Sequence, residues 1–255
     1  MKKLGLTLVM AMMAVMLVAG GAWAVPFNVR PVTVNDSGET TLQEIFNSIG
    51  ATSVDVQADQ NGAALFNPTA SSNSTASFII ELAGNAATNE IGIYDAVGTL
   101  APIFGGSYTA GDRASLQFFA SGLRVSITDA SDPSLSDVQW YDDFGSTFGF
   151  YMNTGSDVFY SEDDKNGGDA QILAYQGNNK DYVTVPGGVK GLFTDTEWIF
   201  AFEDIYLQSS DKDYNDAVIM VESINPVPEP GTMALLGIGL LGLAFVGRKK
   251  LKIEE

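Results

Sequence analysis

Two apolar segments, one near each end, limit the part of this 255-residue chain that can fold as a water-soluble domain. The first covers residues 4–18, follows two lysines, and precedes the small residues Ala22 and Ala24. A positive start, an apolar core and a small-x-small cleavage site are typical of a secretory signal peptide. We therefore expect residues 1–24 to be a signal peptide cut after Ala24, with an uncleaved N-terminal anchor as the alternative.

The second apolar segment covers residues 231–247 and is followed by the cations Arg248, Lys249 and Lys250. As a helix it would rise roughly 25 Å, just short of the ~30 Å hydrocarbon core of a bilayer. It lacks the polar face that a helix of a soluble domain normally keeps. We expect a transmembrane helix over 231–247 and, because cations favour the cytoplasmic side, a basic cytoplasmic tail over 248–255.

The segment between these ends, residues 25–230, is strongly acidic. Six of the 13 lysines and arginines, but only two of the 31 aspartates and glutamates, lie outside it, so its net charge is −22. Such a surface repels nucleic acid and anionic lipid and attracts cations. We therefore expect no nucleic-acid partner.

Cysteine and histidine are absent from the whole sequence. Disulfides, zinc sites built from Cys or His, and Ser-His-Asp or Cys-His catalytic sets are therefore excluded. Carboxylates, hydroxyls and amides remain as the main chemical groups. Oxygen ligands of this kind suit calcium or magnesium.

One short helix is expected near the start of the acidic segment. Thr41 and Glu44 have the spacing of a capping box, and apolar residues follow at helical intervals until Gly50. This pattern predicts a helix over residues 41–49.

The rest of the segment has strand patterns. Residues 123–128 alternate apolar and polar side chains, which predicts a strand with one buried face. Short apolar runs separated by glycine-rich turns predict an all-β domain over 25–222, an antiparallel β-sandwich of jelly-roll type. The polar stretch 67–77 is expected to be a loop. The other predicted strands cover residues 27–34, 77–82, 91–94, 147–152, 171–175, 182–185, 198–202 and 217–221.

Residues 223–230 contain three prolines within five positions and predict an extended, accessible linker. Pro228-Glu229-Pro230, the glycine-rich apolar helix and the Arg248-Lys249-Lys250 cluster resemble the PEP-CTERM sorting signal. The resemblance implies a Gram-negative bacterium that makes extracellular polysaccharide. It also implies an exosortase, a membrane enzyme that cuts near Pro-Glu-Pro, so that the chain crosses the inner membrane only transiently before reaching the cell surface. The alternative is a permanent single-span surface protein.

The densest acidic cluster follows the predicted strand 198–202. Glu203 and Asp204 end that strand, and the run from Asp211 to Asp216 precedes the next one. If the two strands form a hairpin, five carboxylates converge, and calcium with its six to eight oxygen ligands would relieve their repulsion. The spacing Asp211-x-Asp213-x-Asn215 points alternate ligands inward. An EF-hand is excluded, because its sixth position should be glycine and is Asp216.

The same residues carry a second resemblance. Phe202-Glu203-Asp204 and the run from Ser210 to Val218 resemble the end of the family known as domain of unknown function 4114. Residues 89–94 and 161–175 resemble its earlier parts, so that the similarity spans about 85–222. Ala170 departs from the pattern, where the family has histidine. The family has no settled activity. The resemblance implies these functional candidates: Glu90, Glu203, Asp204, Asp211, Asp213, Asn215 and Asp216.

Alternatives stay open for this cluster and for two others. An acidic turn between strands can be only a solvated loop, and paired carboxylates can be catalytic. Residues 162–169 form a second acidic cluster that could hold a metal or simply make a tight turn. Residues 140–143, Trp-Tyr-Asp-Asp, could be an exposed patch on which a sugar stacks, or part of the core.

Three functions fit these features. The first is a non-catalytic, calcium-binding β-sandwich associated with the exopolysaccharide or biofilm matrix outside the cell. The second is a carboxylate-dependent glycoside hydrolase or lyase acting on that polysaccharide. The third is a permanent envelope anchor that scaffolds a partner.

Overall fold

The computed structural model describes residues 28–228 apart from 70–72, 82–86, 107, 131 and 133–135. The predicted signal peptide, transmembrane segment and basic tail, together with Glu229 and Pro230, lie outside the described residues. Within the described part, no helix has both the length and the apolar character needed to cross a membrane.

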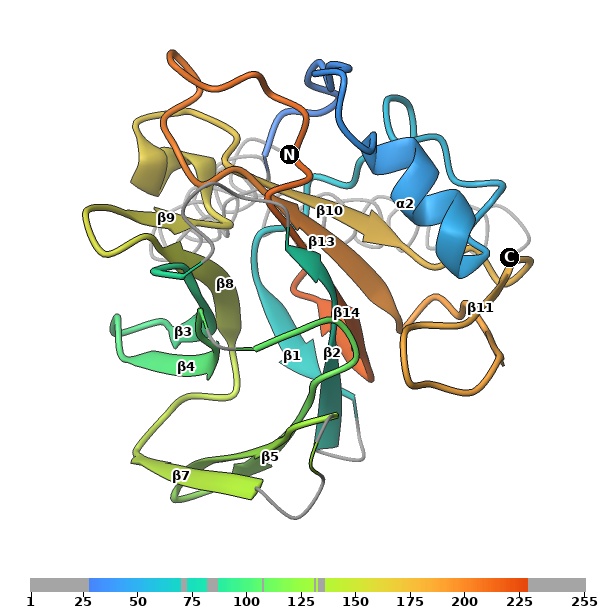
Figure 1. Ribbon diagram of the computed structural model, residues 1–255. Helices are drawn as coiled ribbons and strands as arrows, with labels where there is room; N and C mark the ends of the chain where they lie inside the picture. Colours follow the sequence, from blue (N-terminus) through green and yellow to red (C-terminus); the bar gives the residue numbers. More distant parts are fainter. Residues whose placement is uncertain are drawn as a thin grey trace, which may run out of the picture. The chain divides into compact units, whose positions relative to one another are not determined.

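Two antiparallel sheets contain most of the described strands (Figure 1). The larger has seven strands in the order β10 (Ile172–Gln176), β13 (Trp198–Phe202), β14 (Ala217–Glu222), β2 (Asn73–Glu81), β5 (Arg113–Phe119), β6 (Gly122–Thr128) and β7 (Ser136–Asp142). The smaller has the order β15 (Ile224–Pro226), β1 (Phe66–Pro68), β8 (Phe148–Asn153), β3 (Glu90–Asp95) and β4 (Leu100–Phe104), and β9 (Val158–Tyr160) also pairs with β8. A separate ribbon joins β11 (Tyr182–Val183) to β12 (Gly191–Leu192).

The inner faces of the two sheets contribute to one hydrophobic core. Phe66 of β1 and Phe150 of β8 come from the smaller sheet, and Trp198 and Phe200 of β13 from the larger. The ring centroids of Phe150 and Phe200 are 4.0 Å apart, and those of Phe66 and Trp198 are 4.9 Å apart. Aromatic contacts of this kind add about 0.5–1.5 kcal/mol each beyond the area they bury, so this cluster holds the sheets together.

A second core lies on the other face of the larger sheet, at the end formed by β10, β13 and β14. It is made with α2 (Leu42–Ile49), which begins with a capping box between Thr41 and Glu44 and ends at Gly50. Phe46 of α2 meets Tyr175 of β10 edge to face, with centroids 4.9 Å apart. Figure 1 shows α2 beside β10, with β3, β4 and β8 on the opposite side of that sheet.

These two cores explain two kinds of strand sequence. β13 is buried at every position because both of its faces are covered, and its sequence is a continuous apolar run. β6 instead alternates, with Leu123, Val125 and Ile127 buried and Arg124 exposed, because only one of its faces meets the core. The part of the chain from Pro26 to Val227 forms one compact unit that contains both cores and every described strand.

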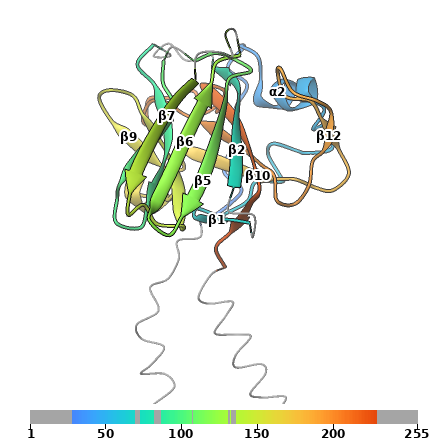
Figure 2. The ribbon, with the colours of Figure 1, turned by 90° about the horizontal axis from the view of Figure 1, so that it is seen from below.

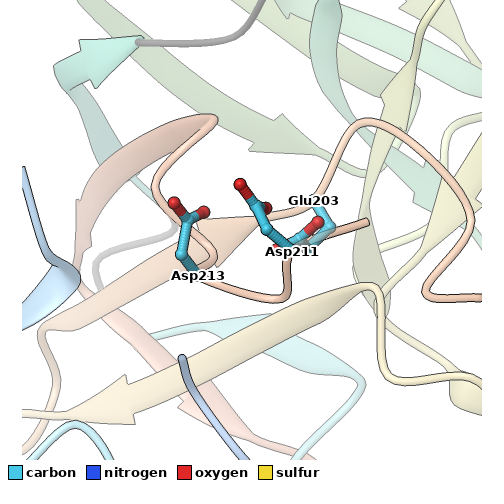
Figure 3. A group of neighbouring side chains, drawn as sticks. All are labelled: Glu203, Asp211 and Asp213. Atoms are coloured by element: carbon cyan, nitrogen blue, oxygen red, sulfur yellow. The ribbon is translucent and has the colours of Figure 1, made fainter. Parts of the chain in front are cut away.

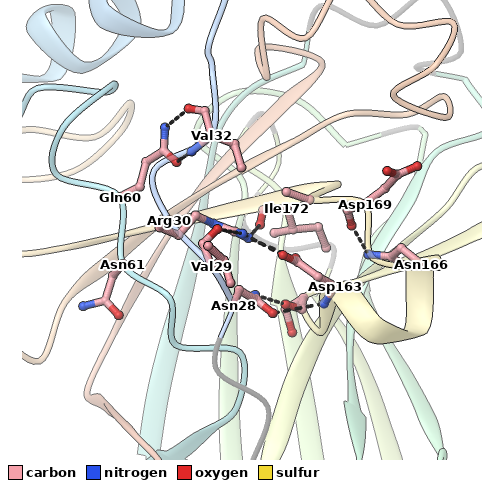
Figure 4. A network of polar contacts seen from close by, with 12 residues as sticks. Asn28, Val29, Arg30, Val32, Gln60, Asn61, Asp163, Asn166, Asp169 and Ile172 are labelled. Carbon is pink, nitrogen blue, oxygen red and sulfur yellow. Dashed lines mark hydrogen bonds and ion pairs between the residues drawn. The ribbon is translucent and has the colours of Figure 1, made fainter.

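The mostly β fold with antiparallel sheets and one short α-helix is confirmed for the described residues, and the jelly-roll sandwich stays a prediction. The strand predicted over 27–34 is wrong for the described residues 28–34, which pair with no strand. Pro31 has no N–H for a ladder, and side chains take the place of a partner strand. Gln60 accepts from the Val32 N–H at 2.8 Å and donates to the Val32 carbonyl at 2.8 Å (Figure 4).

Two segments predicted to be irregular contain strands. The loop predicted over 67–77 includes parts of β1 and β2, because β2 is paired on both edges, with β14 and β5, whatever the polarity of its sequence. Residues 224–226, expected in the linker, form β15 at the edge of the smaller sheet. There Pro226 stands opposite Phe66, an edge position that a residue without an N–H can occupy.

Candidate metal centre

The pairing of β13 with β14 places the acidic residues at one end of the larger sheet. Phe202, the last residue of β13, stands opposite Ala217, the first residue of β14. Glu203 therefore leaves the sheet where Asp216 enters it. The hairpin predicted from the sequence is confirmed, and the loop between its strands carries the remaining acidic residues.

Three carboxylates of this loop region converge. Glu203, Asp211 and Asp213 each offer an oxygen, and the three oxygens lie within 4.8 Å of one another (Figure 3). Two oxygens on one calcium ion are at most about 5 Å apart, twice the Ca–O bond length. Glu203 and Asp213 are only 1% and 2% exposed, whereas Asp211 is exposed. The group therefore has the size of a cation site with one ligand at the solvent side.

Of these three carboxylates, Glu203 has the least favourable environment. Its Oε1 accepts a hydrogen bond from the Tyr214 N–H at 2.9 Å, but its buried Oε2 has no partner. Burial, together with the charges of Asp213 and Asp211, raises the pKa of Glu203 to about 7. An unpaired buried polar atom costs about 1–3 kcal/mol, more when charged. A cation bound here would remove that cost.

The loop backbone separates two sets of side chains. Lys212 and Tyr214 have φ values of 63° and 55°, in the left-handed region that non-glycine residues rarely adopt. They alternate with Asp211, Asp213 and Asn215, and they line a cavity of about 500 Å³ that residues 28, 29 and 31–33 also line. The Tyr214 hydroxyl donates to the Ala170 carbonyl at 2.7 Å and holds this arrangement. The carboxylates of Asp211 and Asp213, the first two members of the Asp-x-Asp-x-Asn pattern, converge, and an inward position of Asn215 stays a prediction.

The N-terminal segment closes over the same loop. Ser37 donates a hydrogen bond to the carboxylate of Asp213, and the Asn35 N–H donates to the Lys212 carbonyl at 2.9 Å. Asn215 in turn donates to the Thr40 carbonyl at 2.9 Å. No local pattern predicts these contacts, because about 175 residues separate the partners.

Asp204 and Asp216 lie beside this group rather than in it. The Asp204 N–H donates to the Asp216 carboxylate at 2.8 Å, and burial followed by the charge of Asp204 raises the pKa of Asp216 to about 8. Asn89 donates to the Asp204 carboxylate at 3.1 Å, and its own buried Oδ1 has no partner. Asn89 was not predicted as a site residue, although it directly precedes the candidate Glu90.

Glu90 stands apart from the three converging carboxylates. It lies in β3 and accepts a hydrogen bond from the Tyr151 hydroxyl at 2.9 Å. Glu222, the residue that an EF-hand would need, is at the far end of β14, opposite Thr75 and five residues beyond Ala217. The sequence-based exclusion of an EF-hand therefore agrees with the structure.

The second acidic cluster, residues 162–169, is engaged with protein groups. Asp163 makes a two-pronged ion pair with Arg30 at 2.7 and 3.0 Å (Figure 4). Glu162 accepts a hydrogen bond from the Tyr94 hydroxyl at 2.7 Å. The Asn166 side chain accepts from the Tyr160 N–H and donates to the Tyr160 carbonyl. Among the described residues, the acidic groups that could hold a metal do not include any from this cluster.

Fold and site together thus define the class of protein: an acidic, mostly β domain with a carboxylate cluster at one end of a sheet. Comparison with family models places residues 143–224 in the domain of unknown function DUF4114 and residues 226–250 in the PEP-CTERM protein-sorting motif. The chain therefore carries both features that its sequence resembles. No curated protein and no solved structure matches it.

The matched ranges bear on the site. The DUF4114 match includes Glu203 and the whole loop to Asp216, but it begins after Glu90, so the resemblance expected from about residue 85 is matched only from 143. The sorting motif begins at Pro226, the last residue of β15. That motif implies an exported protein of a Gram-negative bacterium that an exosortase processes at the membrane or cell surface.

Proposed function

We propose that this protein is a non-catalytic, calcium-binding β-sandwich that acts outside the cell in the exopolysaccharide or biofilm matrix. One observation carries the proposal: three carboxylates converge on a point where the Glu203 Oε2 is buried and unpartnered. A solvated acidic turn would face its carboxylates outward, whereas Glu203 and Asp213 are buried.

Calcium fits this site better than other metals. The chain has neither cysteine nor histidine, so the ligands are oxygens, which select hard cations. Magnesium demands a near-ideal octahedron, whereas calcium accepts six to eight oxygens in irregular arrangements. Glu203, Asp211 and Asp213 come from a strand end and an irregular loop, and Asp204, Asp216 and Asn215 are the nearby candidates for additional oxygens. Extracellular calcium modules typically bind in the range of 10⁻⁴–10⁻³ M.

The geometry supports binding over hydrolysis. A glycosidase needs two carboxyl groups that flank a bond across an open cleft, at about 5–5.5 or 6.5–9.5 Å. Here three carboxylates, not two, have oxygens within 4.8 Å of one another. Ser37 donates a hydrogen bond to Asp213, and the Tyr214 N–H donates to Glu203. Export and release by an exosortase, implied by the sorting motif, would deliver the protein to the matrix.

Thermal unfolding of the segment 26–227 with calcium and with chelator tests the proposal. Calcium at 100 times its dissociation constant stabilises a protein by about 2.7 kcal/mol, which raises the melting temperature of a domain of this size by roughly 5–10 °C. Glu203→Gln and Asp213→Asn should each abolish the shift. Glu203→Gln should also melt no lower than wild type in chelator, because it removes a buried charge without changing shape.

The matched control is Asp195→Asn, which removes an exposed carboxylate outside the cluster and should keep the full calcium shift. Equal melting temperatures of the wild type with calcium and with chelator would refute the metal site. Release of oligosaccharides from matrix polysaccharide by the wild type but not by Glu203→Gln would replace binding with catalysis.

A further inference from the structure

An exposed aromatic pair lies on the outer face of the larger sheet, far along the sheet order from α2. β5, β6 and β7 run side by side nearest the viewer in Figure 2, and α2 lies away from them. Trp140 of β7 is 45% exposed and Phe119 of β5 is 49% exposed. Their ring centroids are 5.3 Å apart with an angle of 39° between the planes. Two large rings therefore form one apolar surface in solvent.

The two rings meet across β6, beside Gly122. The register places Gly122 opposite Phe119 on one side and Asp142 on the other, and the next row of the same face contains Gln117, Arg124 and Trp140. Gly122 is required here by the backbone itself. Its φ of 142° and a backbone oxygen 2.1 Å from where a Cβ would stand exclude any larger residue.

Polar groups surround the rings. The Trp140 Nε1–H donates to the Asp142 carboxylate at 2.6 Å, which fixes the orientation of the indole. In the same row as Trp140, Arg124 donates to Gln117 at 3.1 Å. A flat apolar ring with fixed donors and acceptors around it is complementary to a pyranose, which has an apolar C–H face and a rim of hydroxyls.

A cavity continues this surface. Phe119 also lines a hollow of about 440 Å³ together with Asp143, Phe144 and Ser146. Its volume lies in the roughly 300–1,000 Å³ range of small-molecule sites. Its floor includes Phe118, whose ring stacks on the core residue Phe148 at 5.1 Å. The cavity is thus part of a rigid sheet end.

The carboxylates near the aromatic pair determine which charge a bound polysaccharide could have. Asp142 accepts from the Trp140 indole and Asp143 lines the cavity, and these two carboxylates would repel anionic polysaccharides and nucleic acid. Neutral hydroxyls can donate hydrogen bonds to those carboxylates, and Arg124 can donate to hydroxyl oxygens.

We infer that this face binds a neutral polysaccharide, with one pyranose stacked on Trp140 and a neighbouring unit in the cavity beside Phe119. The site is separate from the carboxylate cluster, which lies at the β13–β14 end of the same sheet. Binding therefore does not depend on calcium. The sugar-stacking role considered for residues 140–143 falls to Trp140, because Tyr141 is half-buried and packs against the core.

Affinity electrophoresis of the segment 26–227, which contains both cores, tests this inference. The gels would contain dextran, mannan, hydroxyethylcellulose or the anionic polymer alginate. At least one neutral polymer should retard the wild type and alginate should not. Trp140→Ala should weaken retardation at least tenfold, and Phe119→Ala should weaken it too. Tyr182→Ala removes an even more exposed ring elsewhere and should bind like the wild type.

Fluorescence provides a readout independent of folding defects. Trp140 and the buried Trp198 are the two tryptophans of this segment, so a polymer-induced shift reports on Trp140. Trp140→Phe should retain partial binding, because a ring remains.

The inference would be overturned by no retardation by any neutral polymer, by equal retardation of Trp140→Ala, or by a wild-type dimer that Trp140→Ala dissociates. Loss of polymer binding in chelator, with the protein still folded, would also overturn it and would place the sugar at the carboxylates. Failure of the calcium shift alone leaves this site intact.

Discussion

Ser37 donates a hydrogen bond to the carboxylate of Asp213, although 176 positions separate them in the sequence. The contact attaches the irregular N-terminal segment to the loop between β13 and β14. Asn35 reinforces it through the Lys212 carbonyl. The carboxylate cluster is therefore completed by a part of the chain that lies outside the DUF4114 match.

Ser37→Ala should weaken calcium binding about tenfold. The hydroxyl orients the Asp213 carboxylate, and loss of such a supporting contact typically lowers metal affinity 10–100-fold. Calcium titration by calorimetry measures the change. Ser156→Ala, at an exposed serine outside the cluster, should bind calcium like the wild type. Identical affinities for Ser37→Ala and the wild type would show that Asp213 is oriented without Ser37.

Arg30→Met should destabilise the domain by about 3 kcal/mol. The Arg30 and Asp163 side chains are 4% and 14% exposed, and removal of one partner leaves the other charge buried. Burial raises the pKa of Asp163 even with Arg30 in place, so the carboxylate depends on its partner. Urea unfolding measures the loss. Lys180→Met, at an exposed cation, should cost little, and adding Asp163→Leu to Arg30→Met should recover part of the stability.

Thr41→Ala should lower the free energy of unfolding by about 1 kcal/mol, or roughly 2–4 °C in melting temperature. Thr41 accepts from the Glu44 N–H at 3.2 Å, and Glu44 accepts from the Thr41 N–H at 2.9 Å. Differential scanning calorimetry measures the shift. Thr41→Ser keeps the hydroxyl and should melt near the wild type. If Thr41→Ala melted there too, contacts of α2 with the sheet alone would determine its stability.

Stability should fall as pH rises above about 10. Burial raises the pKa of the Tyr175 phenol, whose hydroxyl donates to the Val56 carbonyl. Above pH 10 the unfolded phenol loses its proton while the folded one keeps it, so each such tyrosine removes about 1.4 kcal/mol per pH unit. Burial raises the pKa in the same direction for Tyr94, Tyr151, Tyr175 and Tyr214.

Urea unfolding between pH 9 and 11.5 measures this loss. Tyr175→Phe should make the decline shallower by one such contribution, whereas Tyr182→Phe, at an exposed tyrosine, should leave it unchanged. A wild-type stability that stays flat across this range would contradict the protonated buried phenols.

Local patterns in the sequence were sufficient for the elements whose structure is decided locally. The capping box predicted α2, and the alternation over residues 123–128 predicted β6. The segment 28–34 was mispredicted because glutamine side chains, not a strand, satisfy its backbone. The strand predicted over 77–82 matches only the second part of β2. Its first part was predicted as a loop, because its residues are polar and its neighbours β14 and β5 are distant in sequence.

The residues of the candidate site show the same difference between local and long-range determinants. Glu203, Asp211 and Asp213 were predictable because one hairpin brings them together within eleven residues. Ser37 and Asn89 were not, because only tertiary packing brings them to the loop. Glu90 entered through a family resemblance alone, and its carboxylate accepts from Tyr151 rather than joining the cluster.

β15 ends at Pro226, where the sorting motif begins. A cut within residues 228–230 would leave every described strand pairing and both hydrophobic cores in the released part. The released protein would therefore carry with it every pairing that defines the folded unit, and processing would change its address without removing any part of its cores.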